Sequence, residues 1–132
     1  MAKAPQSEAP KPLTPVELEL MQIVWRQGEV SVADVLKALP PERKLAYTSV
    51  STVMRILEQK GVLQSRKVGR GHLYSALLPR EAYELQSVRH LVETMFDGTP
   101  SQLVERLVEA VPLSAEEVAQ LRKLLDKKRS RS

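Results

Sequence analysis

Apolar residues recur with helical spacing in the first part of the chain. The first such stretch is "LTPVELELMQIVWRQG", residues 13–28. There, Thr14 and Glu17 predict a capping box at a helix N-terminus, and Gly28 predicts its end. In "SVADVLKALPP", Ser31 predicts the next N-cap, Asp34 favours the first turn, and two prolines stop the helix. The pattern predicts two successive helices, with their apolar positions at Leu18, Met21, Val24, Trp25, Val32, Val35, Leu36 and Leu39.

The stretch "LAYTSVSTVMRILEQKG", residues 45–61, is ambiguous by propensity, because its β-branched and aromatic residues favour a strand. The period decides for a helix, since apolar residues recur at i, i+3, i+4 and i+7. "VLQSRKV" and "HLYSALL" follow as strand-length runs joined by "GRG", whose glycines allow the positive φ angles of a tight turn. We therefore predict a third helix and then a β-hairpin. The apolar face of this helix comprises Val50, Val53, Met54 and Leu57.

From Pro79 onward the pattern is helical throughout. These helices carry more apolar surface than they can bury alone, and no sheet remains to cover it. We expect residues 80–128 to form a helical dimerisation domain, so that the protein is a homodimer. The alternative is that these helices fold back onto the N-terminal part of the chain. The expected dimerisation residues are Leu85, Val88, Val92, Met95, Phe96, Leu103, Leu107, Val111, Leu121 and Leu124.

Three helices followed by a basic β-hairpin is the order of elements in a winged helix-turn-helix domain, which we place at residues 13–79. The expected fold class is mainly α with a small β-hairpin, a winged helix-turn-helix followed by a helical dimerisation domain. Residues 1–12 are rich in proline and alanine and predict a disordered arm. Residues 129–132 predict a short basic tail.

The composition excludes several classes of protein. The chain has 132 residues, of which 42% are hydrophobic, enough for one compact domain or two small ones. No apolar run is long enough to span a membrane, and the N-terminus lacks the apolar core of a secretory signal. Cysteine is absent, so disulfides and thiolate metal sites are excluded. We expect a soluble cytoplasmic protein.

Residues that could carry catalysis or bind a metal form no recognisable constellation. His72 and His90 are isolated, so no metal site is expected. No histidine–acid pairing supports a serine nucleophile, and "GRG" lacks the lysine and helix of a phosphate-binding loop. Trp25 and Tyr74 are expected to be packing aromatics. We expect no enzymatic activity and no cofactor.

The net charge of +4 is unevenly distributed along the chain. Residues 43–72 carry seven basic side chains against Glu58 alone, whereas residues 1–42 and 80–126 are both net acidic. A basic centre of this kind is typical of a surface that meets phosphate. Charge alone leaves open a solvated basic surface that binds nothing.

The outer face of the predicted third helix carries short hydroxyl side chains and one arginine, where a solvated helix usually carries glutamate and lysine. A helix in the major groove brings its backbone close to base edges, so short side chains suit it, and arginine can fork onto guanine or a phosphate. Basic residues before this helix and in the hairpin turn are then placed for the DNA backbone or the minor groove. We predict contacts to double-stranded DNA from Arg43, Lys44, Thr48, Ser51, Thr52, Arg55, Arg66, Lys67, Arg70 and His72.

Two other functions fit the same elements. The first is a winged-helix module whose basic face binds an acidic protein partner, and sequence-specific, two-fold symmetric DNA binding would distinguish it from a repressor. The second is a repressor gated by a small molecule that binds in a pocket between the domains. Few polar residues interrupt the C-terminal apolar stripes to line such a pocket, which disfavours the second.

Three motifs together resemble the BlaI/MecI/CopY penicillinase-repressor family. They are "LTPVELELMQIVW", "LAYTSVSTVMRILEQKG" and "GRGHLYSALLPREAY", in one order and at the family's spacing, and the resemblance extends from residue 13 to about residue 126. It implies a dimeric bacterial transcriptional repressor that binds dyad-symmetric operators. It also implies that Ser49 joins Thr48, Ser51 and Thr52 among the base-contacting residues.

The resemblance also bears on how repression is relieved. It implies a membrane sensor peptidase as a further partner, and it places the candidate cleavage site at Arg106-Leu107, where β-lactam-responsive members have an Asn-Phe pair. The copper-responsive branch uses C-terminal cysteine pairs. This chain has none, so release by a metal bound in that way is excluded.

Overall fold

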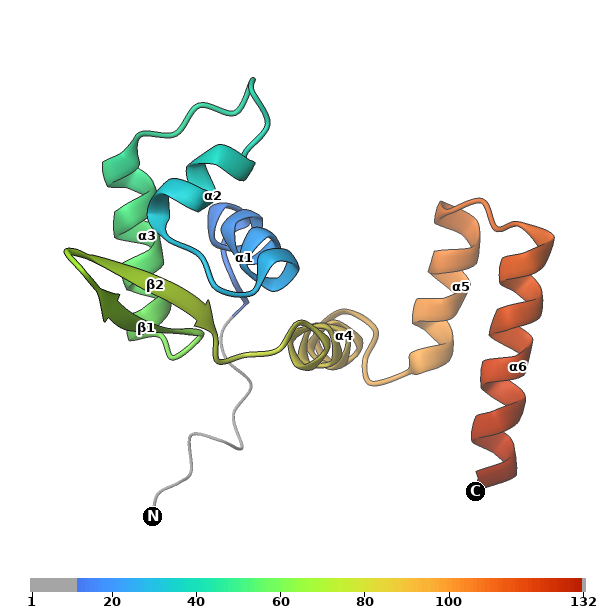
Figure 1. Cartoon of the computed structure of the whole chain (residues 1–132). Helices are drawn as coiled ribbons and strands as arrows, with labels where there is room; N and C mark the ends of the chain where they lie inside the picture. Colours follow the sequence, from blue (N-terminus) through green and yellow to red (C-terminus); the bar gives the residue numbers. More distant parts are fainter. Residues whose placement is uncertain (1–11, 132) are drawn as a thin grey trace, which may run out of the picture. The chain divides into compact units, whose positions relative to one another are not determined.

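The structure, a computed structural model, describes residues 12–131 of the chain (Figure 1). The chain divides into two compact units between Ser87 and Val88. The predicted disordered arm, residues 1–12, lies outside the described residues except for Pro12. The limits that we predicted for the two domains stay a prediction. In chain order the elements are α1 (Pro15–Gln27), α2 (Val32–Ala38), α3 (Tyr47–Gln59), β1 (Leu63–Val68), β2 (Gly71–Ala76), α4 (Arg80–Met95), α5 (Pro100–Ala110) and α6 (Ala115–Arg131).

Helices α1 and α2 begin at the capping boxes that their sequences contain. Thr14 Oγ1 accepts a hydrogen bond from the Glu17 N–H at 3.2 Å, and Glu17 Oε1 accepts one from the Thr14 N–H at 2.9 Å. Ser31 and Asp34 form the second box in the same way. Gly28 ends α1 with a φ of 95°, which a residue without a Cβ adopts at little cost. The two predicted helices are confirmed.

Helix α3 confirms the choice of helix over strand. Val50, Met54 and Leu57 are buried on the face that packs against α1 and α2, and Val53 packs at the edge of this core. Tertiary burial of this stripe therefore outweighs the strand propensity of the individual residues. Helices α2 and α3 form the helix-turn-helix, and α1 packs against both of them. The fully buried core residues are Leu20, Met21, Val24, Val30, Val35, Val50, Met54, Leu57 and Leu63.

Strands β1 and β2 pair antiparallel and form the wing (Figure 1). Val68 pairs with Gly71, so Gly69 and Arg70 alone make the turn, and Gly69 has a φ of 60°. Gly71 has no positive φ and is the first residue of β2. Tyr74 also exchanges two backbone hydrogen bonds with Val30, at 2.7 and 2.9 Å, which attaches the wing to the segment between α1 and α2.

The predicted packing role of the two aromatics is confirmed. Tyr74 is buried in the core, and Trp25 packs against the core from its edge. The Trp25 Nε1–H donates a hydrogen bond of 2.8 Å to the Leu78 carbonyl oxygen. Both side chains thus hold elements of the winged helix together.

The second unit consists of the end of α4 with α5 and α6. Helix α6 continues without a break to Arg131, so the predicted basic tail is helical up to that residue. The stretch "KKRSR" contains no glycine or proline to stop the helix, and basic side chains stabilise a helix C-terminus through its dipole. Within residues 12–131, no helix is both long and apolar enough to cross a bilayer.

Candidate nucleic-acid interface

The outer face of α3 presents its hydroxyl and arginine side chains to solvent. Thr48, Thr52 and Arg55 are exposed, and Ser51 is partly covered. The core-facing stripe lies on the other side of the same helix, so the side chains that could meet bases are not needed for packing. Ser49 is likewise exposed to solvent.

The N-terminus of α3 is left uncapped within the described part of the chain. Ala46 occupies the N-cap, no side chain accepts a hydrogen bond from the first turn, and that turn contains no acidic residue. The first intrahelical bond is donated by the Val50 N–H to the Ala46 carbonyl. Free N–H groups at the positive end of a helix favour a phosphate, and Lys44 lies exposed just before them.

Two of the predicted DNA-contacting arginines are already engaged by carboxylates. Arg43 donates from Nε and Nη2 to Glu19, with Nε–Oε2 at 2.9 Å and Nη2–Oε1 at 3.1 Å. Arg66 pairs with Glu29 in the same two-pronged manner, at 2.7 and 3.0 Å. Hydrogen bonds and charge attraction within these pairs raise the pKa of both arginines, and they lower the pKa of Glu29.

Four other predicted cations remain available. Among the residues that the structure describes, no acidic side chain pairs with Lys44, Arg55, Lys67 or Arg70, and all four are exposed. Arg70 lies in the two-residue turn at the tip of the wing, and Lys67 faces His72 across the strand pair. Because alternate strand residues point to opposite faces, Lys67 and the engaged Arg66 lie on different sides of the wing. The free positive charge is therefore concentrated before α3, on its outer face and at the wing tip.

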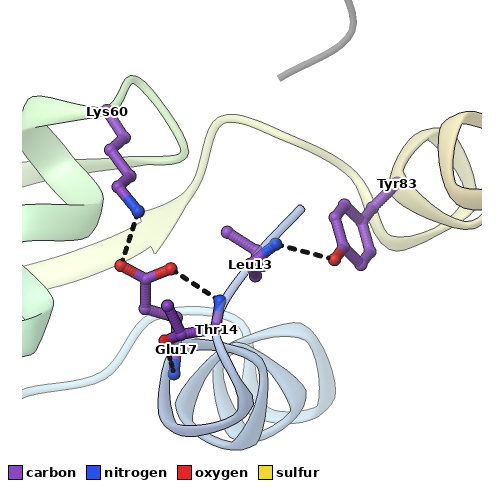
Figure 2. Close-up of polar contacts among 5 residues, drawn as sticks. All are labelled: Leu13, Thr14, Glu17, Lys60 and Tyr83. Carbon is purple, nitrogen blue, oxygen red and sulfur yellow. Dashed lines mark hydrogen bonds and ion pairs between the residues drawn. The ribbon is translucent and has the colours of Figure 1, made fainter. Parts of the chain in front are cut away.

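An ion pair with a buried carboxylate holds the far end of α3, and the sequence pattern did not reveal it. Glu17 is only 6% exposed, and its Oε2 lies 2.7 Å from Lys60 Nζ at the C-terminal end of α3 (Figure 2). Burial alone would raise the pKa of Glu17, but the hydrogen bonds from Lys60 and the Thr14 N–H prevail and lower it. The capping box predicted one role for Glu17; its second partner is 43 residues away in sequence.

A second contact links α3 to the wing. The Ser65 hydroxyl of β1 donates a hydrogen bond of 2.7 Å to Glu58 Oε2 on the last turn of α3. Glu58 is the single acidic residue among residues 43–72, and this was the only feature of the sequence that set it apart. The carboxylate of Glu58 therefore has a structural role, because its hydrogen bond with Ser65 connects α3 to strand β1 of the wing.

The predicted DNA-contacting residues come from the segment before α3, from α3 itself and from the wing, and their contacts with DNA stay a prediction. Within residues 12–131, no group of three histidine, cysteine or acidic side chains is placed to hold a metal. A helix with an open polar face, an uncapped N-terminus and an adjacent basic wing define the class of the protein. It is a winged helix-turn-helix DNA-binding protein.

Comparison with known proteins identifies the family. A family model described as penicillinase repressor matches residues 13–127, and the chain belongs to this family. It is 25% identical to the penicillinase repressor of Bacillus licheniformis over 131 residues, 99% of this chain and 98% of that protein. It is 23% identical to the methicillin resistance regulatory protein MecI of Mammaliicoccus sciuri over 116 residues, 88% and 94% of the two chains.

A solved structure supports the same assignment. The solution structure of the DNA-binding domain of the repressor BlaI covers 58% of this chain and 92% of its own, with 25% identity and a TM-score of 0.50. The predicted family is thus confirmed, as is the predicted fold class of a mainly α protein with a winged helix-turn-helix and a small β-hairpin. The protein is a DNA-binding transcriptional repressor, and its family is one of repressors and not of enzymes.

Proposed function

We propose that the repressor acts as a homodimer that places two copies of α3 on a dyad-symmetric operator. The observation that carries this proposal is the lack of a core in the second unit. None of the side chains described from Val88 to Ser130 is buried. Helices of this length are marginal in water without tertiary packing, so a second copy is the simplest partner to supply it.

Apolar side chains available for this contact are exposed on α5 and α6. An open groove of about 720 Å³ is lined by Val104, Val108 and Leu125, with Leu125 64% exposed. These three line the groove although they were not among the expected dimerisation residues. Of the expected residues, Leu85, Val88, Met95, Leu107, Val111 and Leu124 are exposed, and Val92, Phe96, Leu103 and Leu121 are partly covered.

Dimerisation would give the protein its affinity for the operator. A single winged helix presents one recognition helix and one wing, and its binding to a half-site is weak. Joining two such domains makes the second contact intramolecular and multiplies the affinity by roughly 10²–10⁴. Occupation of the operator would then exclude transcription, and separation of the C-terminal helices would relieve it.

We further propose that cleavage or separation of the C-terminal helices is the route of release. Arg106-Leu107 lies within α5, where Arg106 pairs with Glu109. Cutting this peptide bond would divide α5 and remove the apolar residues of α6 from the dimer. A membrane sensor peptidase is the partner that this route requires, and a cytoplasmic location of the repressor belongs to the same proposal.

The substitution Leu107→Asp tests the dimer, because Leu107 is 41% exposed on the apolar side of α5. Gln102→Asp, on the same helix but outside the apolar stripe, is the matched control. Sedimentation velocity reports the oligomeric state, and fluorescence anisotropy compares the protein's own upstream DNA with a scrambled duplex. We expect Leu107→Asp to be monomeric and to lose selective binding, and the control to behave as the parent. A monomeric variant that still holds the upstream DNA as tightly as the parent would overturn the proposal.

A further inference from the structure

Helix α4 is joined to the wing without a flexible linker. Only residues 77–79 separate β2 from α4. The Leu77 and Leu78 N–H groups both donate to the Val62 carbonyl oxygen, at 2.9 and 3.2 Å, and the Leu78 carbonyl accepts from Trp25. Pro79 follows, with a φ angle restricted by its ring. Leu77 and Leu78 are therefore held by the winged helix, and the conformation of Pro79 is restricted by its own ring.

Tyr83 attaches the first turns of α4 to the winged helix a second time. Its ring lies 5.8 Å from that of Trp25, at an interplanar angle of 34°. Its hydroxyl oxygen accepts a hydrogen bond of 3.0 Å from the Leu13 N–H, 70 residues earlier in the chain (Figure 2). These contacts bind the side of α4 to Trp25 and Leu13, in addition to the backbone connection at Leu78.

The segment Leu13–Thr14, which binds Tyr83, is also connected to the C-terminal end of α3. Leu13 donates its N–H to Tyr83, and the next residue, Thr14, donates its N–H to Glu17, which pairs with Lys60 at the end of α3. Figure 2 shows the five residues that make this connection. Tyr83 of α4 is thus bonded directly to Leu13, and Lys60 at the end of α3 is linked to the next residue, Thr14, through the carboxylate of Glu17.

We propose that Tyr83 is a positioning residue for operator recognition, which determines the spacing between half-sites that the repressor accepts. This inference rests on the proposed homodimer. Helix α4 runs without a break from Arg80 to Met95. In this proposal, the contacts of Tyr83 restrict the helix at its first turns. In a dimer, that restriction limits the distance and rotation between the two copies of α3.

The physical consequence is discrimination by spacing, because each added base pair moves a half-site by about 3.4 Å and turns it about the DNA axis. A stiff joint makes a wrongly spaced site costly. Loosening the joint lowers that cost and also weakens binding at the best spacing, since the ordering must then occur on binding. Tyr83 would therefore affect specificity without touching DNA.

The experiment compares the parent with Tyr83→Phe, which removes only the hydroxyl, and Tyr83→Ala, which also removes the ring contact. The probe is the duplex that the parent protein selects from a random-sequence library, with its centre lengthened or shortened by one and two base pairs, together with a single half-site duplex. Anisotropy gives each affinity at one salt concentration. We expect the preference for the best spacing to fall about threefold in Tyr83→Phe, the loss of one hydrogen bond, and about tenfold or more in Tyr83→Ala. Half-site affinity should be unchanged in both.

Glu84→Gln is the matched control, because Glu84 lies next to Tyr83 on α4 and pairs only with the exposed Arg80 among the described residues. It should keep the parent's spacing profile. If the parent selects a dyad-symmetric site and both Tyr83 variants keep its profile, the positioning role is wrong and the dimer stands. A fall in half-site affinity that matches the loss on the full site would also overturn it, since Tyr83 would then act through the stability of the winged helix. If the parent selects a site without symmetry and binds it as one chain, both proposals fail.

Discussion

Lys60 Nζ lies 2.7 Å from Glu17 Oε2, so the C-cap residue of α3 is bonded to the first turn of α1. The carboxylate is buried and also closes the capping box of α1, whereas the lysine side chain is about 40% exposed. One side chain thus caps the start of α1 and holds the end of α3. The pair explains why a charged residue is tolerated at the edge of this small core.

Removal of the lysine should destabilise the winged helix. Lys60→Met leaves Glu17 buried with the Thr14 N–H but without a cation, and we expect a loss of about 2 kcal/mol in the free energy of unfolding, below the cost of an entirely buried pair because Lys60 is partly solvated. Lys60→Arg retains the charge and should lose less. Urea unfolding measures both. Equal stability of Lys60→Met and the parent would show that the pair contributes nothing.

The same pair predicts a dependence of stability on pH. The pKa of Glu17 is lowered in the folded protein, so its contribution is complete above the unfolded value of about 4.5 and is lost as the pH falls through the folded value. Glu17→Gln should be less stable than the parent at neutral pH, and the difference should shrink as the pH falls below about 4.5. The comparison isolates Glu17 because Glu29 and Asp34, whose pKa values are also lowered, are present in both proteins. A constant difference across this range would contradict the assignment.

The ion pairs of the interface predict unequal contributions from two arginines of the wing. Arg70→Ala should flatten the dependence of log K on log salt concentration by roughly one unit, because Arg70 releases about one counterion on contact with phosphate. Arg66→Ala should have a smaller effect, since Glu29 already neutralises Arg66. Anisotropy titrations on a random-sequence duplex at several salt concentrations measure both slopes. Equal slopes for the two variants would mean that Arg66 leaves Glu29 when DNA binds.

The outer face of α3 predicts a loss of selectivity without a loss of general affinity. Thr52→Val keeps the shape and the methyl group but removes the hydroxyl from an exposed position, so folding should be unaffected. We expect the ratio of operator to random-duplex affinity to fall by about tenfold, the lower part of the range for one base contact. Thr52→Ser, which keeps the hydroxyl, is the control. Parallel losses on both duplexes would show that Thr52 contacts only the backbone.

Several features of the protein were predictable from local sequence because their causes are local. The capping boxes at Thr14 and Ser31 and the turn at Gly69 depend on residues within a few positions of one another, and the structure contains them. The helical period of α3 was also a sufficient guide to its burial. The same pattern placed the hydroxyl side chains of this helix opposite the core, where the structure has them.

Other features depend on side chains that meet only after folding. Arg43 and Arg66 are basic residues in a basic segment, and nothing in their neighbourhood shows that Glu19 and Glu29 engage them from α1 and the loop after it. The contact of Tyr83 with Leu13 spans 70 positions. Charge counting therefore overstates the number of free cations at the interface.

By itself, the sequence determined the helices, the wing, the polar face of α3 and the family, because periodicity, caps, turn glycines and ordered motifs are properties of short stretches. Only the tertiary structure decided which cations are free, how α3 is held at its far end, and where α4 is fastened. These depend on distances between residues far apart in the chain, which the packing of the core sets and which no local pattern encodes.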